Sequence, residues 1–244
     1  MIIMKRTFKT VCASATLACL FATGGQAQQL ISNGGFETGF TGWTRADQVG
    51  SESTWLQQSG AASPVNGFVV PSPPGGTNAA MTDAQGPGAH LLYRDFVVPL
   101  TLGVTTLRFD LYINNHASAF FSPSTLDFAT PTLNQQFRVD ILSASADPFS
   151  VAVGDVLMAV YQTQPGNPLV SGYVTIMADL TSLFAAHAGE TLRLRFAEVD
   201  NVNFLNVGVD NVSIVVVPEP TSLTLLVGVG GLLCLLLVKR RRRQ

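Results

Sequence analysis

The feature that most constrains the fold is a strict alternation of apolar and polar residues in short runs. In residues 105–115, every second side chain from Leu107 to Ile113 is large and apolar. A repeat of two places alternate side chains on opposite faces of a strand, so one face is buried and the other meets water. Arg193 and Arg195 fall on the polar positions of such a run, and we expect them to point into water. The clearest runs are 91–98, 105–115, 136–142, 156–163, 173–178, 191–198 and 207–216.

Clusters of Gly, Pro, Asn and Ser separate these runs, which is the pattern of many short strands rather than of helices. We therefore predict an all-β sandwich. One short crossover helix is expected at 180–187, with Asp179 or Thr181 as its cap and Gly189 at its end. Two stretches are expected to be surface loops: the Gly- and Pro-rich residues 63–76, and residues 115–134 around Pro123 and Pro131.

The charges are divided between the body of the chain and its ends. Residues 28–217 hold six arginines and no lysine against 15 acidic residues, a net charge of −9. This body lacks the clustered Lys and Arg that bind nucleic acids or anionic membranes, so we expect no nucleic-acid partner. Its 190 residues contain no cysteine, because Cys12, Cys19 and Cys234 lie outside them. One domain held by its apolar core, without disulfides, is the expectation.

The first 27 residues are typical of a signal peptide. Lys5 and Arg6 precede an apolar stretch, and Gly25-Gln26-Ala27 places small residues ahead of a cut after residue 27. One alternative is lipoprotein processing at Cys19, although a threonine stands where an apolar residue is preferred. Another alternative is an uncleaved anchor, although the apolar stretch is short for a bilayer.

The last 27 residues combine three features in order. Pro218-Glu219-Pro220 is followed by 18 uncharged residues, 221–238, and then by the basic tail 239–244. At about 1.5 Å per residue the uncharged run makes about 27 Å of helix, so we expect a C-terminal single transmembrane helix. A basic tail stays on the cytoplasmic side, which leaves the acidic body outside. The arginines of the tail that belong to this pattern are Arg240, Arg241 and Arg242.

This ordered set closely resembles the PEP-CTERM sorting signal of Gram-negative bacteria. The resemblance implies recognition by an exosortase, a membrane-embedded transpeptidase-like enzyme, followed by removal of the tail. It also implies delivery of the body to the cell envelope or to an extracellular polysaccharide matrix. By themselves, the two prolines indicate an extended strip that a protease can reach. A permanent tail anchor is the alternative. The predicted domains are 1–27, 28–217 and 218–244.

The two ends of the body carry a second resemblance. Residues 30–37, Leu-Ile-Ser-Asn-Gly-Gly-Phe-Glu, and residues 209–214, Val-Asp-Asn-Val-Ser-Ile, resemble the first and last strands of jelly-roll carbohydrate-binding modules of the galactose-binding-like superfamily. The resemblance covers roughly 29–216. It implies a jelly-roll β-sandwich that binds polysaccharide. Trp43 follows a Gly-rich turn, and we expect it to fill the core.

A structural Ca²⁺ is the cofactor prediction. In that family an opening Glu and a closing Asp share a Ca²⁺ with backbone carbonyls, and these positions match Glu37 and Asp210. Two carboxylates brought together by paired strands repel each other unless a cation or an arginine lies between them. Gly35 is a candidate carbonyl ligand, because no side chain blocks its backbone. The alternative is that Glu37 caps a turn and Asp210 accepts a hydrogen bond beside Asn211.

Sugar binding requires aromatic faces together with a few polar groups. The candidate exposed aromatics are Trp55, Tyr112, Phe120, Phe121 and Tyr161, with Asn114, Asn115 and His116 beside Tyr112. The alternative for each aromatic is a place in the core. The resemblance transfers no binding residue, because sugar-contacting positions vary within that family.

An enzyme is not expected. No metalloprotease motif, G-x-S-x-G sequence or phosphate-binding loop occurs in the chain. A glycosidase needs two carboxylates about 5–10 Å apart, and nothing in the sequence singles out a pair. The run 200–203, with Asn206, has the chemistry of a turn. The sequence thus indicates an exported, non-enzymatic, polysaccharide-binding protein of a Gram-negative surface or matrix. A purely structural or adhesive envelope or biofilm protein is the alternative.

Overall fold

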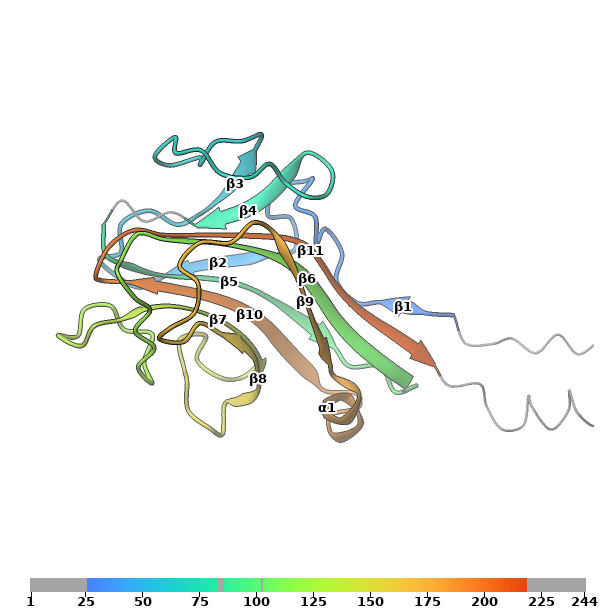
Figure 1. Cartoon of the computed structure of the whole chain (residues 1–244). Coiled ribbons are helices and arrows are strands. Elements are labelled where there is room, and N and C mark those ends of the chain that lie inside the picture. Colours follow the sequence, from blue (N-terminus) through green and yellow to red (C-terminus); the bar gives the residue numbers. More distant parts are fainter. Residues whose placement is uncertain (1–25, 83–85, 102, 219–244) are drawn as a thin grey trace, which may run out of the picture. The chain divides into compact units, whose positions relative to one another are not determined.

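The fold is known from a computed structural model that describes residues 26–82, 86–101 and 103–218. Within these ranges the chain forms eleven strands and one short helix (Figure 1). The elements are β1 Gln28–Gln29, β2 Thr44–Asp47, β3 Trp55–Ser59, β4 Asn78–Thr82, β5 Gly88–Val97, β6 Gly103–Asn115, β7 Gln135–Ser143, β8 Val156–Gln162, β9 Val174–Asp179, α1 Thr181–Ala186, β10 Thr191–Asp200 and β11 Leu205–Pro218.

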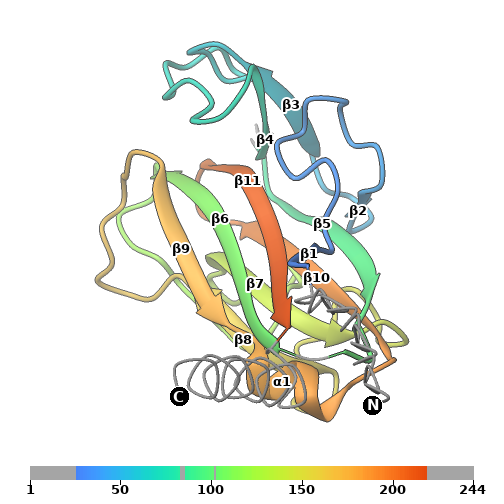
Figure 2. The ribbon, with the colours of Figure 1, turned by 90° about the vertical axis from the view of Figure 1, so that its right-hand side faces the viewer.

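The strands form two antiparallel sheets stacked as two layers (Figures 1 and 2). Sheet I has the order β3-β4-β11-β6-β9, and β1 pairs with β11 beside this path. Sheet II has the order β2-β5-β10-β7-β8. The last strand, β11, therefore lies in the middle of sheet I, between β4 and β6. The described part of the chain is an all-β sandwich, as the alternation predicted.

The longer strands were the predictable ones. All seven predicted runs are strands, with ends within three residues of the expected ones. Residues 30–37, which resemble a first strand, form a turn instead, and the first strand, β1, lies just before them. Strands β2 to β4 were not predicted, because they are short and poor in β-branched residues; β4, for example, reads Asn-Ala-Ala-Met-Thr. The predicted helix is present as α1 and crosses from β9 in sheet I to β10 in sheet II. Leu180 stands at the N-cap position and makes no side-chain capping bond, but Asp179, one of the two predicted caps, accepts a hydrogen bond from the backbone N–H of Thr181 at 2.8 Å.

The core lies between the sheets and is rich in aromatic rings. Trp43 is buried there as predicted, with ring centroids 5.3 Å from Phe36 and 6.0 Å from Phe196. Its indole Nε1 donates a hydrogen bond to the carbonyl of Asn33 at 3.0 Å. Asn33 adopts a φ of 53°, which an asparagine tolerates better than most residues. The turn around Asn33 is thus fixed to the core.

The same turn joins the first strands to the last one. The backbone N–H of Val212 donates to the carbonyl of Gly34 at 2.9 Å. A Cβ on Gly34 would lie 1.8 Å from the carbonyl oxygen of Val212, so only glycine allows this approach. The contact holds the opening of the body against its closing strand.

The outer face of sheet II differs from expectation. Arg193 and Arg195 are 7% and 0% exposed, so the prediction that they point into water is wrong. Arg195 pairs with the buried Asp140, which also accepts two hydrogen bonds from Arg138. Arg193 pairs with Asp95. The connection between β7 and β8 covers this face and accepts further bonds from both arginines, which the alternation cannot reveal.

Candidate functional site

The aromatic residues predicted to bind sugar are buried. Trp55 and Phe120 have no exposed surface. Trp55 begins β3 with its ring in the core, and its Nε1 donates to the carbonyl of His90 at 3.2 Å. Phe120 also packs in the core. The expectation that these two rings are exposed is therefore wrong.

Tyr112 is also buried, with 2% of its surface exposed. It lies on the outer face of sheet I, where Val70 and Tyr173 cover it. The prediction that Tyr112 is exposed is wrong for the same reason as on sheet II, because a loop covers the outward-facing side chains of the strand. Asn114 is half-buried and lies opposite Asn206 in the pairing of β6 with β11. It is not among the residues that line the cavity described next.

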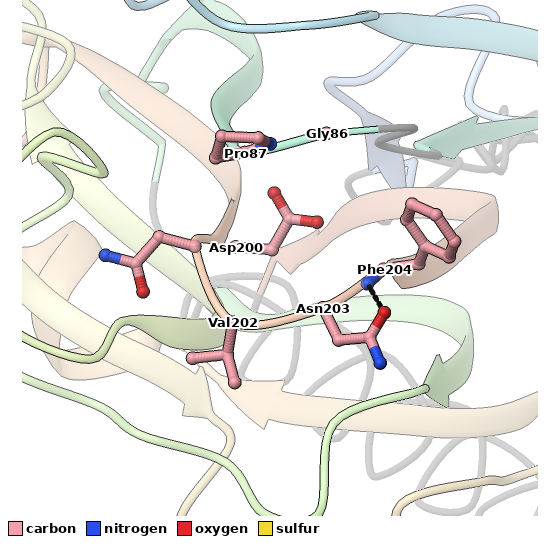
Figure 3. Close-up of a pocket in the computed structure, with 7 residues that line it drawn as sticks. Gly86, Pro87, Asp200, Val202, Asn203 and Phe204 are labelled. Atoms are coloured by element: carbon pink, nitrogen blue, oxygen red, sulfur yellow. Dashed lines mark hydrogen bonds between the residues drawn. The ribbon is translucent and has the colours of Figure 1, made fainter.

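A cavity of about 210 Å³ opens beside the turn between β10 and β11 (Figure 3). Gly86 and Pro87, which lead into β5, form one wall, and the run from Asp200 to Phe204 forms the other. The Asp200 carboxylate points across the cavity toward Gly86 and Pro87 (Figure 3). Its Oδ1 accepts a hydrogen bond from the backbone N–H of Gly88 at 3.0 Å. The cavity therefore combines a carboxylate, backbone groups and an aromatic edge.

Two side-chain amides hold the turn that forms this wall. The side chain of Gln135 accepts hydrogen bonds from the backbone N–H groups of Val202 and Asn203 and donates to the carbonyl of Asn203 at 2.7 Å. The side chain of Asn201 donates to the carbonyl of Phe128 at 3.0 Å. Turn chemistry was the predicted role of this Asn-rich run, and these bonds confirm it for residues 201–203, whereas Asn206 is buried within β11. They also fix one wall of the cavity in place.

Three rings form a strip that starts at the cavity. Phe204 lines the cavity and packs edge-on against His116, with centroids 6.2 Å apart. His116 is exposed and lies 5.5 Å from Phe68, which is 43% exposed. Asn203 donates its side-chain N–H to the carbonyl of His116 at 3.0 Å. We call Phe68, His116 and Phe204 the aromatic strip.

Sequence reasoning named only one member of this strip. His116 was noted as a neighbour of Tyr112, whereas Phe68 and Phe204 were missed. Both of them follow turn residues, Gly67 and Asn203. An aromatic residue placed directly after a turn was the signal that could have found them, because turns lie on the surface.

A second depression adjoins the cavity. It has a volume of about 400 Å³ and is lined by residues 128–133 together with Pro87 and Asn201. Pro87 and Asn201 also line the cavity, so the two share part of their walls. The cavity alone is smaller than the roughly 300–1,000 Å³ typical of sites that enclose a compact ligand. The aromatic strip, the cavity and the second depression form an open surface that suits an extended ligand.

The predicted metal ligands are brought together. The carboxylate of Glu37 accepts hydrogen bonds from the backbone N–H groups of Thr77 and Asn78 at 2.8 and 3.0 Å. These bonds lower the pKa of Glu37. Asp210 lies near Gly35, since a Cβ on Gly35 would stand 3.6 Å from Asp210 Oδ1. The turn-capping role considered as an alternative for Glu37 is thus present.

The carboxylate of Asp210 sits in an unfavourable electrostatic setting. Burial, and to a lesser degree the charges of Asp110 and Glu37, raise its pKa to about 6, against hydrogen bonds from the N–H groups of Asn211 and Gly75 that lower it. Among the described residues, no basic side chain pairs with Glu37 or Asp210. The described part also contains no group of three metal-binding side chains. The donor set fits a hard cation that takes its remaining ligands from carbonyls.

The predicted sorting motif falls mostly outside the described residues. Pro218 ends β11 and pairs with Gly103. In the part that the structure describes, no helix is long and apolar enough to cross a membrane. The predictions that lie outside the described residues are the signal peptide up to residue 25, Glu219, Pro220, the span 221–238 and Arg240, Arg241 and Arg242.

No protein-family model and no curated protein matches this chain. Among solved structures, the K3 cleaved adhesin domain of Lys-gingipain from Porphyromonas gingivalis is 13% identical, with a TM-score of 0.48 over 78% of this chain and 99% of that one. TmCBM61 in complex with β-1,4-galactotriose is 9% identical, with a TM-score of 0.44 over 77% of this chain and 97% of that one. A Stig cyclase from Fischerella sp. TAU is 17% identical, with a TM-score of 0.45 over 80% of this chain and 100% of that one. These scores lie below 0.5, so the likenesses decide nothing about function.

Proposed function

We propose that the protein is an exported, non-enzymatic jelly-roll module that binds polysaccharide at the cell surface or in the extracellular matrix. The observation that supports this most is the aromatic strip running into a cavity with polar walls. Ligand sites of this kind pair apolar platforms with a few fixed polar groups. The ring of Phe204 would receive the apolar face of a sugar, and Asp200 and Asn203 would take its hydroxyl groups.

The rigidity of the turn favours binding. Gln135 and Asn201 hold the wall of the cavity through bonds to backbone groups. A ligand therefore orders little protein when it binds, and less of its interaction energy is lost to conformational entropy. An open site of this kind suits long chains, which extend beyond the cavity into the second depression.

The test is affinity gel electrophoresis of the purified protein in gels that contain soluble polysaccharides. Phe204→Ala removes the ring at the cavity and should weaken retardation about tenfold, since loss of one aromatic contact costs about 1.4 kcal/mol. Leu100→Ala is the matched control, because Leu100 is 81% exposed and follows β5 at its other end. Equal retardation of wild type and Phe204→Ala would refute this site. Absence of retardation in every gel would favour the structural or adhesive alternative.

We further propose that the C-terminal segment is a sorting signal that an exosortase removes. The support is the ordered sequence of Pro218-Glu219-Pro220, the uncharged span and the arginines. Mass spectrometry of the protein isolated from the cell surface tests this directly. The expected form lacks the leader before residue 28 and the segment after the Pro-Glu-Pro motif. A mature protein that keeps residues 221–244 would instead favour the permanent anchor.

We propose that Glu37 and Asp210 hold a structural Ca²⁺ with the carbonyl of Gly35. The support is a pair of carboxylates with no basic partner among the described residues, one with a raised pKa. Ca²⁺ would neutralise the pair and pin the first strands to the last. A Ca²⁺ concentration of 100 times the dissociation constant should raise Tm over EDTA by roughly 5–10 °C. Asp210→Asn should abolish the rise, whereas the exposed-loop control Asp147→Asn should keep it. Equal Tm values in Ca²⁺ and EDTA would exclude the metal.

A further inference from the structure

The sequence contains two Asn-Gly pairs, Asn33-Gly34 and Asn66-Gly67. In such a pair the backbone nitrogen of the glycine can attack the side-chain amide of the asparagine, because glycine has no Cβ to hinder the approach. Whether the reaction occurs in a folded protein depends on how firmly the amide is held and on the space around the glycine. The two pairs differ in both respects.

The fold protects the pair Asn33-Gly34. The Asn33 amide nitrogen donates to the carbonyls of Gly39 at 2.9 Å and Thr41 at 3.1 Å. Its Oδ1 accepts a hydrogen bond from the backbone N–H of Thr38 at 3.2 Å. Gly34 is itself buried. Three hydrogen bonds must therefore break before the amide carbon of Asn33 can turn toward the nitrogen of Gly34.

The pair Asn66-Gly67 lies at the tip of a small hairpin in the connection between β3 and β4, at the top of Figure 1. A bridge between Ala62 and Val69 closes this hairpin. Gly67 is exposed and adopts a φ of 70°. Nothing lies within 4 Å of a Cβ built on Gly67, so the space beside its backbone is open.

The amide of Asn66 is held at one atom only. Its Oδ1 accepts a hydrogen bond from the backbone N–H of Phe68 at 3.0 Å, and this bond makes the amide carbon a better target for a nucleophile. Its Nδ2 is buried and has no hydrogen-bond partner among the described residues, an arrangement that costs free energy. The N–H of Gly67 makes one bond, to the carbonyl of Ser63 at 3.2 Å, which is the long end of the usual range. The nitrogen that leaves in the reaction is thus the one that the fold does not hold.

We propose that Asn66 is a site of deamidation. The nitrogen of Gly67 forms a bond to Cγ of Asn66, the Cγ–Nδ2 bond breaks, and the proton of the Gly67 N–H leaves with Nδ2 as ammonia. Water then opens the cyclic imide at either carbonyl and gives aspartate or isoaspartate at this position. Either product adds a negative charge at the hairpin tip, and isoaspartate also lengthens the main chain ahead of Phe68. Because Phe68 belongs to the aromatic strip, the reaction alters that surface.

The test is peptide mapping by mass spectrometry of full-length protein that has been kept folded at mildly alkaline pH. Trypsin cuts after Arg45, which places the two asparagines in different peptides. Deamidation at Asn66 should be at least about tenfold faster than at Asn33, a difference of about 1.4 kcal/mol in the barrier. In protein unfolded by urea the two rates should become similar, because the protection of Asn33 comes from the fold.

Two variants check the route. Gly67→Ala places a methyl group beside the attacking nitrogen and should slow the reaction at Asn66 about tenfold or more. Gly154→Ala is the matched control, because nothing lies within 4 Å of its new Cβ either, and it should leave the rate at Asn66 unchanged. Emission from the buried Trp43 and Trp55 verifies that each variant is folded.

Three outcomes would overturn the proposal. The first is an equal or faster rate at Asn33 in the folded protein. The second is no deamidation at Asn66 in the folded protein while the unfolded protein reacts at both positions. The third is an unchanged rate at Asn66 in folded Gly67→Ala, which would exclude attack by this backbone nitrogen. The result does not depend on whether the protein binds polysaccharide.

Discussion

Acidification should stabilise this protein between pH 7.5 and pH 5 when metal is removed. The reason is Asp210, whose pKa rises from 3.8 to about 6 on folding. A group that binds its proton more tightly in the folded state stabilises that state at low pH. This stability is complete below the unfolded pKa of 3.8 and is lost as the pH rises through 6. Lowering the pH through this window therefore raises the free energy of unfolding.

The size of the effect follows from the two pKa values. With 3.8 for the unfolded chain and about 6 for the folded one, the gain from pH 7.5 to pH 5 is about 1.4 kcal/mol. For a domain of this size that corresponds to a rise in Tm of about 3–5 °C. The window must end near pH 5, because Glu37 and Asp179 have lowered pKa values. Their contribution has the opposite sign and is lost as the pH falls further.

Urea unfolding in EDTA measures the effect, with emission from the buried Trp43 and Trp55 as the signal. Asp210→Asn is the comparison, because it keeps the shape of the side chain and removes its titration. Subtracting the two curves cancels every other titrating group, including the histidines. From pH 7.5 to pH 5, the free energy of unfolding of wild type should rise by about 1.4 kcal/mol more than that of the variant. Parallel curves would refute the assignment of a raised pKa to Asp210.

Two further predictions concern buried contacts outside the apolar core. Asp140→Ala leaves Arg195 buried without its counter-charge and should cost about 3–5 kcal/mol in urea unfolding; a loss below about 1 kcal/mol would show that the pairing contributes little. Gly34→Ala drives a methyl group into the carbonyl of Val212 and should cost about 1–3 kcal/mol or more. Gly154→Ala, where nothing lies within 4 Å of the new Cβ, should be nearly neutral, and equal losses in the two variants would contradict the steric argument.

The alternation of the long strands predicted the sheets but not what covers them. It placed Leu107 and Ile113 in the core correctly, because the buried phase of a strand is a local property. It wrongly predicted that Arg195 and Tyr112 are exposed, because loops distant in sequence cover the outer faces of the sheets on which they lie. Whether the outward-facing side chains are buried depends on where a loop folds back over the sheet. The alternation within the strand cannot predict that position.

The candidate site was predicted less well than the fold. Trp55 was favoured because Trp is a good sugar platform, yet its position at the start of β3 points it into the core. The strip formed around Phe204 depends on a turn and on two loops that meet only in three dimensions. The juxtaposition of Gly35 with Asp210 was predicted, because the motifs of the first and last strands carried it.

The central place of β11 in sheet I has a consequence for how the chain is made. Until residue 218 has been synthesised, β4 and β6 lack the strand that joins them, and the first residues of the body lack the partner of β1. The sheet cannot be completed from the N-terminus onward, and its pairing is dominated by contacts far apart in sequence, which makes folding slow. Until β11 has been synthesised, the incomplete chain exposes the unpaired edges of β4 and β6. Copies of the incomplete chain would aggregate through these edges unless they are kept apart.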